Sequence, residues 1–182
     1  MMLMFNMYIR SKLDYCCLIW SPWQKKDIDK VERIQNNFTS RIEGMTNLNY
    51  HERLRKLNLY SLERRRERFM IINAWQQLEG VKENILCFKE VGKGRGRTIK
   101  TTRIPNSNKI LIFNSIARRM ERLFNSMPPY LRDVSGVKTE RFKVQLDRWL
   151  QTVPDLPRID DYGASVAAET NSIYHQAHFV TH

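Results

Sequence analysis

Apolar residues recur at helical spacing along much of the chain. Over residues 27–42 they lie three or four positions apart, with basic residues between them. This spacing predicts an amphipathic helix whose apolar stripe faces the core. Gly44 follows the stripe and suits a left-handed cap at the helix end. The stripe consists of Ile28, Val31, Ile34, Phe38 and Ile42.

Two helices are predicted between residues 50 and 80. The segment YHERLRKL, residues 50–57, predicts a short one, and Ser61 suits the N-cap of a longer helix that runs to Gly80. The longer helix begins with four arginines within five positions and then becomes apolar on more than one side. Its second half is therefore expected to pack against two neighbours. The four arginines are Arg64, Arg65, Arg66 and Arg68.

The pattern changes after residue 92. Residues 93–109 contain glycines, a proline and almost no apolar periodicity, which indicates a loop or an extended segment. Helical spacing returns from Ile116 and is ended by Pro128 and Pro129. A last helix is predicted from about Thr139, with inward side chains followed by Pro154. These inward residues are Phe142, Leu146, Trp149, Leu150 and Val153.

These elements predict a mainly α protein. We expect one compact multi-helix unit over residues 1–155, with an extended basic loop at residues 91–112, and an irregular C-terminal tail over residues 156–182.

The charge balance adds a partner class to this picture. The chain of 182 residues carries a formal net charge of +12. An excess of this size attracts polyanions, so nucleic acid is the first partner to consider, and a generically basic protein is the alternative. Residues 93–122 hold nine basic residues and one acidic residue, Glu121.

The sequence offers little material for catalysis, and we expect no catalytic residue, no metal site and no cofactor. Two-metal polymerases and nucleases need carboxylates gathered on a rigid frame, whereas Asp160 and Asp161 lie in a proline-flanked tail and are interpreted as a solvated turn. Three histidines near the C-terminus have helical spacing but no further ligand nearby, and are interpreted as part of a frayed end. They are His175, His178 and His182.

The remaining composition favours a reducing, intracellular location, cytoplasm or nucleus. Three cysteines give neither the number nor the spacing of a disulfide scaffold or a zinc site. Neither a secretory leader nor an apolar run long enough to span a bilayer is expected from the sequence, so no membrane partner is predicted.

Clustered cations are the one chemistry for which residues are abundant. Lysine and arginine side chains that neutralise phosphates release condensed counterions, so such clusters bind RNA or DNA without reading its sequence. Glycines in KGRGR, residues 93–97, let a backbone approach a phosphate chain closely. The predicted nucleic-acid-binding residues are Arg64, Arg65, Arg68, Lys93, Arg95, Arg97, Lys100 and Arg103.

Four blocks in succession resemble one protein family. They are RSKLDYCCLIWSPWQKKDIDKVERIQNNFTSRI, LNYHERLRKLNLYSLERRRERFMIINAW, RLFNSMPPYLRD and FKVQLDRWLQTVPDLP. Together, over roughly residues 9–172, they resemble the region that follows the polymerase core in reverse transcriptases of non-LTR, LINE-type, jockey-like retrotransposons.

This resemblance implies a noncatalytic fragment of an RNA-directed DNA polymerase, beginning within thumb-side helices that hold RNA or a template-primer. The catalytic YxDD-type motif of the family would lie upstream, and IDDY at residues 159–162 does not match it. Family catalytic residues therefore carry over to no position. A helical scaffold that docks on the polymerase core is the alternative, with Trp20, Trp23 and Trp75 as its anchors.

Overall fold

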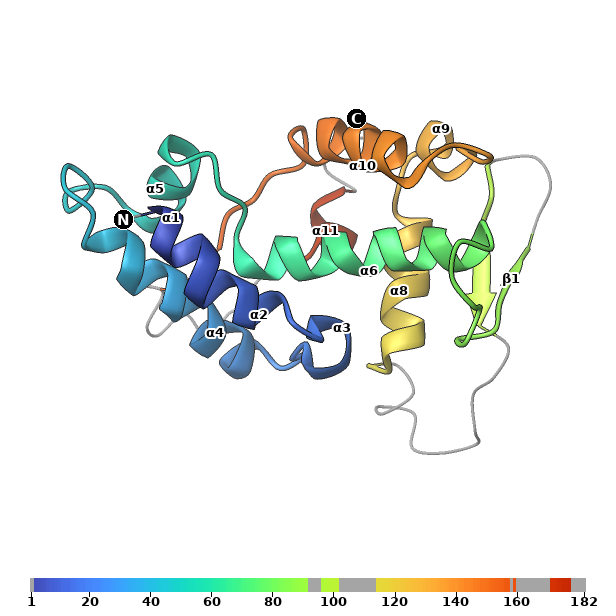
Figure 1. Ribbon diagram of the computed structural model, residues 1–182, viewed down its shortest axis with the longest axis horizontal. Coiled ribbons are helices and arrows are strands. Elements are labelled where there is room, and N and C mark those ends of the chain that lie inside the picture. Colours follow the sequence, from blue (N-terminus) through green and yellow to red (C-terminus); the bar gives the residue numbers. More distant parts are fainter. Residues whose placement is uncertain (1, 92–95, 102–113, 158, 160–170, 178–182) are drawn as a thin grey trace. The chain divides into compact units, whose positions relative to one another are not determined.

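The protein is mainly helical, as predicted (Figure 1). It divides into two compact units. The computed structural model describes residues 2–91, 96–101, 114–157, 159 and 171–177. Unit 1 comprises Met1–Arg66 with Asp155–Ser172, and unit 2 comprises Glu67–Pro154 with Ile173–His182. Residues of the predicted C-terminal tail thus belong to both units, and the part described near the end of the chain includes a short helix.

Unit 1 is built from short N-terminal helical segments, two further helices and the first residues of a long one. The N-terminal segments are α1 (Met2–Met4), η1 (Phe5–Arg10), α2 (Ser11–Asp14) and α3 (Cys17–Trp20). The others are α4 (Lys25–Ser40), α5 (Tyr50–Lys56) and α6 (Leu62–Leu78), of which Leu62–Arg66 belong to this unit. Phe5 stacks on Phe38 with ring centroids 4.4 Å apart, which joins η1 to α4.

Helix α4 confirms the predicted helix, but the stripe expected to face the core was wrong in part. Ile34 is 41% exposed. The buried positions are instead Glu32, Gln35 and Thr39, spaced three and four residues apart. A polar side chain can be buried at little cost when it is hydrogen-bonded. Gln35 meets that condition by donating to the Tyr60 carbonyl at 2.9 Å.

Glu32 joins α4 to the start of α6. Its Oε1 accepts hydrogen bonds from the Leu62 N–H at 2.8 Å and the Tyr50 hydroxyl at 2.6 Å, and its Oε2 accepts one from the Glu63 N–H at 3.1 Å. The first N–H groups of a helix have no partner within it, and their positive end favours an anion. The Glu32 carboxylate, which comes from another helix, therefore accepts hydrogen bonds from N–H groups at the start of α6 that have no partner within that helix.

Ser61 is the N-cap of α6, which confirms the prediction. Its Oγ accepts from the Arg64 N–H at 3.1 Å. Residues near the C-terminal end of the chain hold Ser61 in place, since its N–H donates to Asp155 at 2.9 Å and the Asn171 amide donates to its hydroxyl at 3.2 Å. Asn171, from the predicted irregular tail, thus packs into unit 1 together with Asp155, because this amide and this carboxylate satisfy polar groups of the turn before α6.

Unit 2 contains the rest of α6 and the elements around it. They are β1 (Phe88–Glu90), β2 (Ile99–Thr101), α8 (Ile116–Asn125), α9 (Pro129–Arg132), α10 (Thr139–Leu150) and α11 (Ile173–Gln176). Helices α6 and α10 run antiparallel (Figure 1), because Trp75 stacks on Phe142 at 4.5 Å and Arg68 pairs with Asp147. All five residues predicted to face inward from the last helix are buried.

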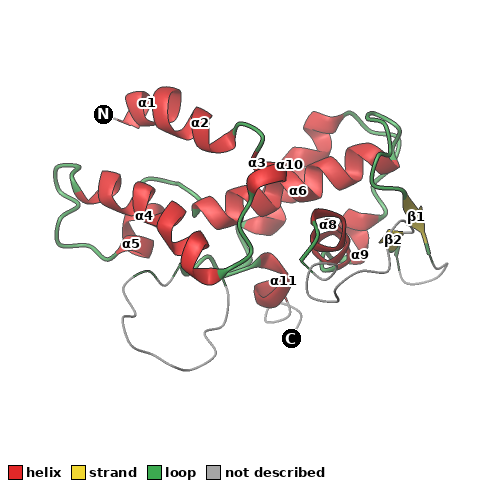
Figure 2. Ribbon diagram, turned by 90° about the horizontal axis from the view of Figure 1, so that it is seen from below, coloured by secondary structure: helices red, strands yellow, loops and turns green. Residues whose placement is uncertain are grey.

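Strands β1 and β2 form a two-stranded antiparallel ribbon. The sequence predicted an extended or loop segment over residues 93–109, which contains β2, and made no prediction for β1. Helix α8 covers the open edge of β2 (Figure 2). The Ile99 N–H donates to Asn125 Oδ1 and the Asn125 amide donates to the Ile99 carbonyl, both at 2.9 Å. The Thr101 N–H donates to Glu121 at 2.9 Å. Side chains of α8 therefore take the place of a third strand.

The buried Glu32 carboxyl determines how the stability of unit 1 changes with pH. Burial raises the pKa of Glu32 above its ordinary 4.5, and hydrogen bonds from Tyr50 and Leu62 oppose that rise. The native state therefore holds this proton to a higher pH than the unfolded chain does. The stabilisation that comes from the protonated Glu32 carboxyl is fully present in the free energy of unfolding below pH 4.5. It is lost as the pH rises through the pKa that Glu32 has in the native state.

Urea titrations at a series of pH values, followed by tryptophan fluorescence, test this expectation. We expect Glu32→Gln, which cannot titrate, to lose less unfolding free energy than the wild type as the pH rises above 4.5. Glu43→Gln removes an exposed carboxylate of the same unit and is the matched control. Parallel pH profiles for the wild type and Glu32→Gln would contradict the assignment.

Candidate nucleic-acid interface

The first turns of α6 do not present their arginines to solvent. Arg64 is 0% exposed and Arg66 is 4% exposed, although helix starts rich in charge usually lie on a wet surface. The guanidinium of Arg66 lies 5.8 Å from the centre of the Trp20 ring, a cation–π distance. The prediction that Arg64 binds nucleic acid was therefore wrong, because a fully buried side chain cannot reach a phosphate.

Arg65 and Arg68 are each held by an aspartate. In unit 1, Arg65 forms two parallel hydrogen bonds with Asp14, Nε to Oδ1 at 2.8 Å and Nη2 to Oδ2 at 2.5 Å. In unit 2, Arg68 does the same with Asp147 at 2.5 and 2.7 Å. Bidentate pairs of this kind are among the stronger side-chain interactions. Both arginines hold helices together within their unit, and the positive charge of each is compensated by its aspartate.

Arg97 also acts within the fold. Its Nη1 lies 2.6 Å from Glu79 Oε1 and its Nε 2.9 Å from Glu90 Oε1. Partial burial alone would lower the pKa of Arg97, but the hydrogen bonds to Glu90 and Glu79 outweigh burial and raise it. Arg97, a predicted phosphate ligand, thus joins Glu90 at the end of β1 to Glu79, the residue that follows α6.

Lys100 differs from these arginines. It lies on β2 directly opposite Lys89 on β1, and both residues are exposed. Neither lysine forms an ion pair within the part of the chain that the structure describes. We call Lys89 and Lys100 the lysine pair. Like charges directly opposite each other across two strands destabilise the strand pairing. The lysine pair therefore does not contribute to the stability of the fold.

Alternation along the strands separates the lysine pair from the core. Phe88 and Thr101, the neighbouring cross-strand pair, are buried, and so is Ile99. The lysine pair therefore lies on the solvent side of the ribbon.

The carboxylates placed next to the ribbon are already engaged. Glu79 and Glu90 hold Arg97. Glu121 pairs with Arg118 at 2.9 Å and also accepts from the Thr101 N–H, and Asp133 accepts from the Arg97 N–H at 2.7 Å. These contacts keep the acidic side chains in the framework and leave the positive charge of the lysine pair outside it.

Five of the eight predicted site residues lie in the described part of the chain. Among these five, Lys100 alone is exposed and has no carboxylate partner within that part. Lys93, Arg95 and Arg103 lie outside the described residues. Sequence reasoning missed Lys89. The signal was present in the short alternation FKEV on one side of the glycine-containing segment and TIKT on the other, which is typical of a hairpin.

Unit 1 has exposed lysines of its own on α4. Lys26 and Lys30 are one turn apart. Lys30 pairs with Asp27 at 3.1 Å, and Lys25 pairs with Asp29 at the same distance. Opposite charges on the same helix thus compensate part of this face, unlike the lysine pair.

The ion pair between Arg68 and Asp147 is predicted to stabilise unit 2. Thermodynamic coupling measured from Arg68→Ala, Asp147→Ala and the double variant should reach about 1 kcal/mol of unfolding free energy, since the pair is bidentate and partly buried. The pair Lys143 and Glu140, 3.9 Å apart, is a control with expected coupling near zero. Additive effects of the two single variants at Arg68 and Asp147 would contradict a structural role.

Comparison of the chain with protein-family models, with curated proteins and with solved structures finds no match. Among the helices of the described residues, none has the length and apolar character needed to cross a membrane. The same residues contain no group of three histidine, cysteine, aspartate or glutamate side chains placed to hold a metal ion.

Proposed function

We propose that this chain binds the phosphate backbone of RNA or single-stranded DNA without catalysing a reaction, through the solvent face of the β1–β2 ribbon. The observation that carries the proposal is the lysine pair: two exposed ammonium groups set opposite each other, while nearby carboxylates are engaged elsewhere.

A phosphate between the two lysines removes the repulsion that the ribbon otherwise contains. Directly opposed residues have Cβ atoms about 5 Å apart, so two flexible lysine side chains can reach the same anion. Each contact also releases condensed counterions from the nucleic acid, which makes binding sensitive to salt and nearly independent of sequence. Lys93 and Arg95 lie between the two strands in sequence and would extend the same charge.

The resemblance of four sequence blocks to the post-palm region of LINE-type reverse transcriptases supports the same class of ligand. In this proposal the chain is a noncatalytic C-terminal segment of an RNA-directed DNA polymerase, and its helices support the ribbon. Arg68 fits this supporting role, since its ion pair with Asp147 joins α6 to α10 within the same unit as the ribbon.

Replacing the lysine pair tests the proposal. We expect Lys89→Gln with Lys100→Gln to weaken binding to a labelled oligonucleotide at low salt, and to reduce the slope of log affinity against log salt by about 1.4, which corresponds to two phosphate contacts on a single strand. Fluorescence anisotropy titrations over a range of salt concentrations measure both quantities.

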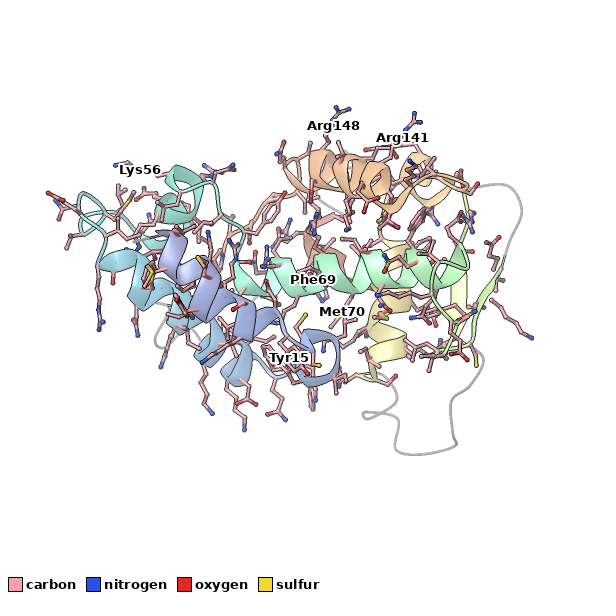
Figure 3. All side chains as sticks on the ribbon, viewed as in Figure 1. Tyr15, Lys56, Phe69, Met70, Arg141 and Arg148 are labelled. Atoms are coloured by element: carbon pink, nitrogen blue, oxygen red, sulfur yellow. The ribbon has the colours of Figure 1, made fainter. Side chains whose placement is uncertain are left out.

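Arg141→Gln with Arg148→Gln is the matched control. These two exposed arginines project from the outer side of α10 in the same unit (Figure 3). The control removes the same formal charge from unit 2. If both double variants change the salt slope equally, net charge and not the ribbon governs binding, and the proposed site is wrong.

A second candidate function, a scaffold that docks on the polymerase core, is favoured by the N-terminal helical segments of unit 1. Four large apolar residues there are more than half exposed: Leu3 (70%), Met4 (59%), Met7 (57%) and Tyr8 (59%). Exposed apolar patches mark sites of protein interaction when they are contiguous. Trp20 and Trp23 are 38% and 45% exposed and fit the predicted anchors.

Trp75 was wrongly predicted as an anchor of that scaffold. It is 0% exposed, stacks on Phe142 and donates its indole N–H to the Val134 carbonyl at 2.8 Å. A buried indole needs such an acceptor, and this one is supplied within unit 2.

The scaffold function predicts that the isolated chain binds a hydrophobic dye such as ANS at the N-terminal face. Met4→Gln with Met7→Gln should lower the dye fluorescence and leave the unfolding free energy within about 0.5 kcal/mol, because both side chains are exposed. A monomeric chain that melts sharply and binds no dye would argue against this function.

A further inference from the structure

We propose that Tyr130 stacks on an unpaired base of the nucleic acid held by the lysine pair, so that the ribbon site selects single strands over duplex. This inference rests on the proposed function and adds to it the class of ligand. It depends on where α9 places this tyrosine and on how firmly α9 is attached to the ribbon.

Helix α9 buries one side and exposes Tyr130 on the other. Leu131 and Arg132 are 1% and 9% exposed, whereas Tyr130 is 66% exposed. Among the described residues of unit 2, Tyr130 is the only exposed residue with a phenylalanine, tyrosine or tryptophan ring. The other exposed large apolar residues of that unit are aliphatic. A single exposed aromatic residue is common on protein surfaces, so exposure alone does not make Tyr130 part of a binding site. The surroundings of Tyr130 supply the further evidence.

Those surroundings fix α9 against the ribbon segment that leads into β2. A Cβ atom on Gly96 would lie 3.0 Å from Pro129 Cβ and 3.1 Å from Pro129 Cα, so the two backbones are in close contact. The Arg132 guanidinium donates to the Arg97 carbonyl at 3.1 Å, and the Arg97 N–H donates to Asp133 at 2.7 Å. The residue before Tyr130 and two that follow it are thus all tied to residues 96 and 97.

Gly96 has a φ of +86°, in the left-handed region. This conformation, together with the short distance to Pro129, requires glycine at this position. The start of β2 and α9 are therefore in direct contact, and this contact places the backbone of Tyr130 beside the ribbon.

The distance from this surface to the lysine pair suits a bound strand. Residues 96 and 100 are four positions apart, and a fully extended chain rises about 3.3 Å per residue, so at most about 13 Å separate their Cα atoms. A strand whose phosphates lie on the lysine pair can thus bring a neighbouring base to the tyrosine ring. The two parts of such a site make different contacts: the lysines neutralise phosphate, and the tyrosine ring stacks on a base.

Stacking gives this site a preference for single strands. Every base has a π face, so an exposed aromatic side chain stacks on unpaired bases with little dependence on sequence. In a duplex the bases are already stacked on one another and their faces are not accessible. The lysine pair alone would bind both forms through their phosphates.

Anisotropy titrations with a short labelled oligo(dA) and with the same strand in a duplex test the inference. We expect the wild type to prefer the single strand. Tyr130→Ala should weaken single-strand binding about tenfold, within the range measured for base–aromatic stacking, and should leave duplex binding nearly unchanged. Tyr130→Phe should keep the preference, because it retains the ring.

Tyr15→Ala is the matched control, since Tyr15 is 76% exposed and belongs to unit 1 (Figure 3). A loss in Tyr130→Ala that is equal for single strand and duplex, or no loss at all, would overturn the stacking inference while phosphate binding stands. If the wild type binds neither probe at low salt, the proposed function itself fails. Loss in Tyr130→Phe equal to that in Tyr130→Ala would assign the effect to the hydroxyl and also overturn stacking.

Discussion

The fold depends on compensating the charges that α6 carries into the protein. A buried ion is unfavourable unless an opposite charge and hydrogen bonds accompany it, and removing one partner leaves the other exposed to that cost. Glu32 meets the N-terminal end of α6, Asp14 holds Arg65, and Asp147 holds Arg68. Within each unit, carboxylates from other segments of the chain thereby fix the helices around the first turns of α6.

This constraint decides which cations can serve a ligand. An arginine already held by a carboxylate has fewer free N–H groups and less uncompensated positive charge left for a phosphate. Arg97 is an example, since two glutamates hold it next to the start of β2. The lysine pair lies in solvent without such a partner in the described residues, and we therefore propose it as the site for a polyanion. A high net charge thus does not indicate where a basic protein binds its ligand.

Local patterns predicted the helices well because the signals for their ends are local. Ser61 and the two prolines at 128 and 129 mark ends that the structure confirms. The inward face of α10 also follows from apolar spacing alone. The inward face of α4 does not, since Glu32 and Gln35 are buried by hydrogen bonds to segments that follow much later in the chain.

The candidate site was harder to predict for the same physical reason. Arg65 and its aspartate are 51 positions apart, and Arg68 and its aspartate 79, so no window of sequence contains both charges. The strands of the ribbon are three residues each, too short for alternation to be distinguished from a loop. Lys100 was selected from charge density in the sequence. Lys89 was not, because its relation to Lys100 depends on the strand register that places the two residues opposite each other.

Lysine footprinting tests the central claim most directly. The chain is acetylated with and without a saturating oligonucleotide, and the modified lysines are quantified by mass spectrometry. We predict that the nucleic acid protects Lys89 and Lys100, while the exposed Lys56 and Lys138 keep their reactivity. Protection confined to Lys26 and Lys30 of α4, or spread evenly over all exposed lysines, would contradict the account.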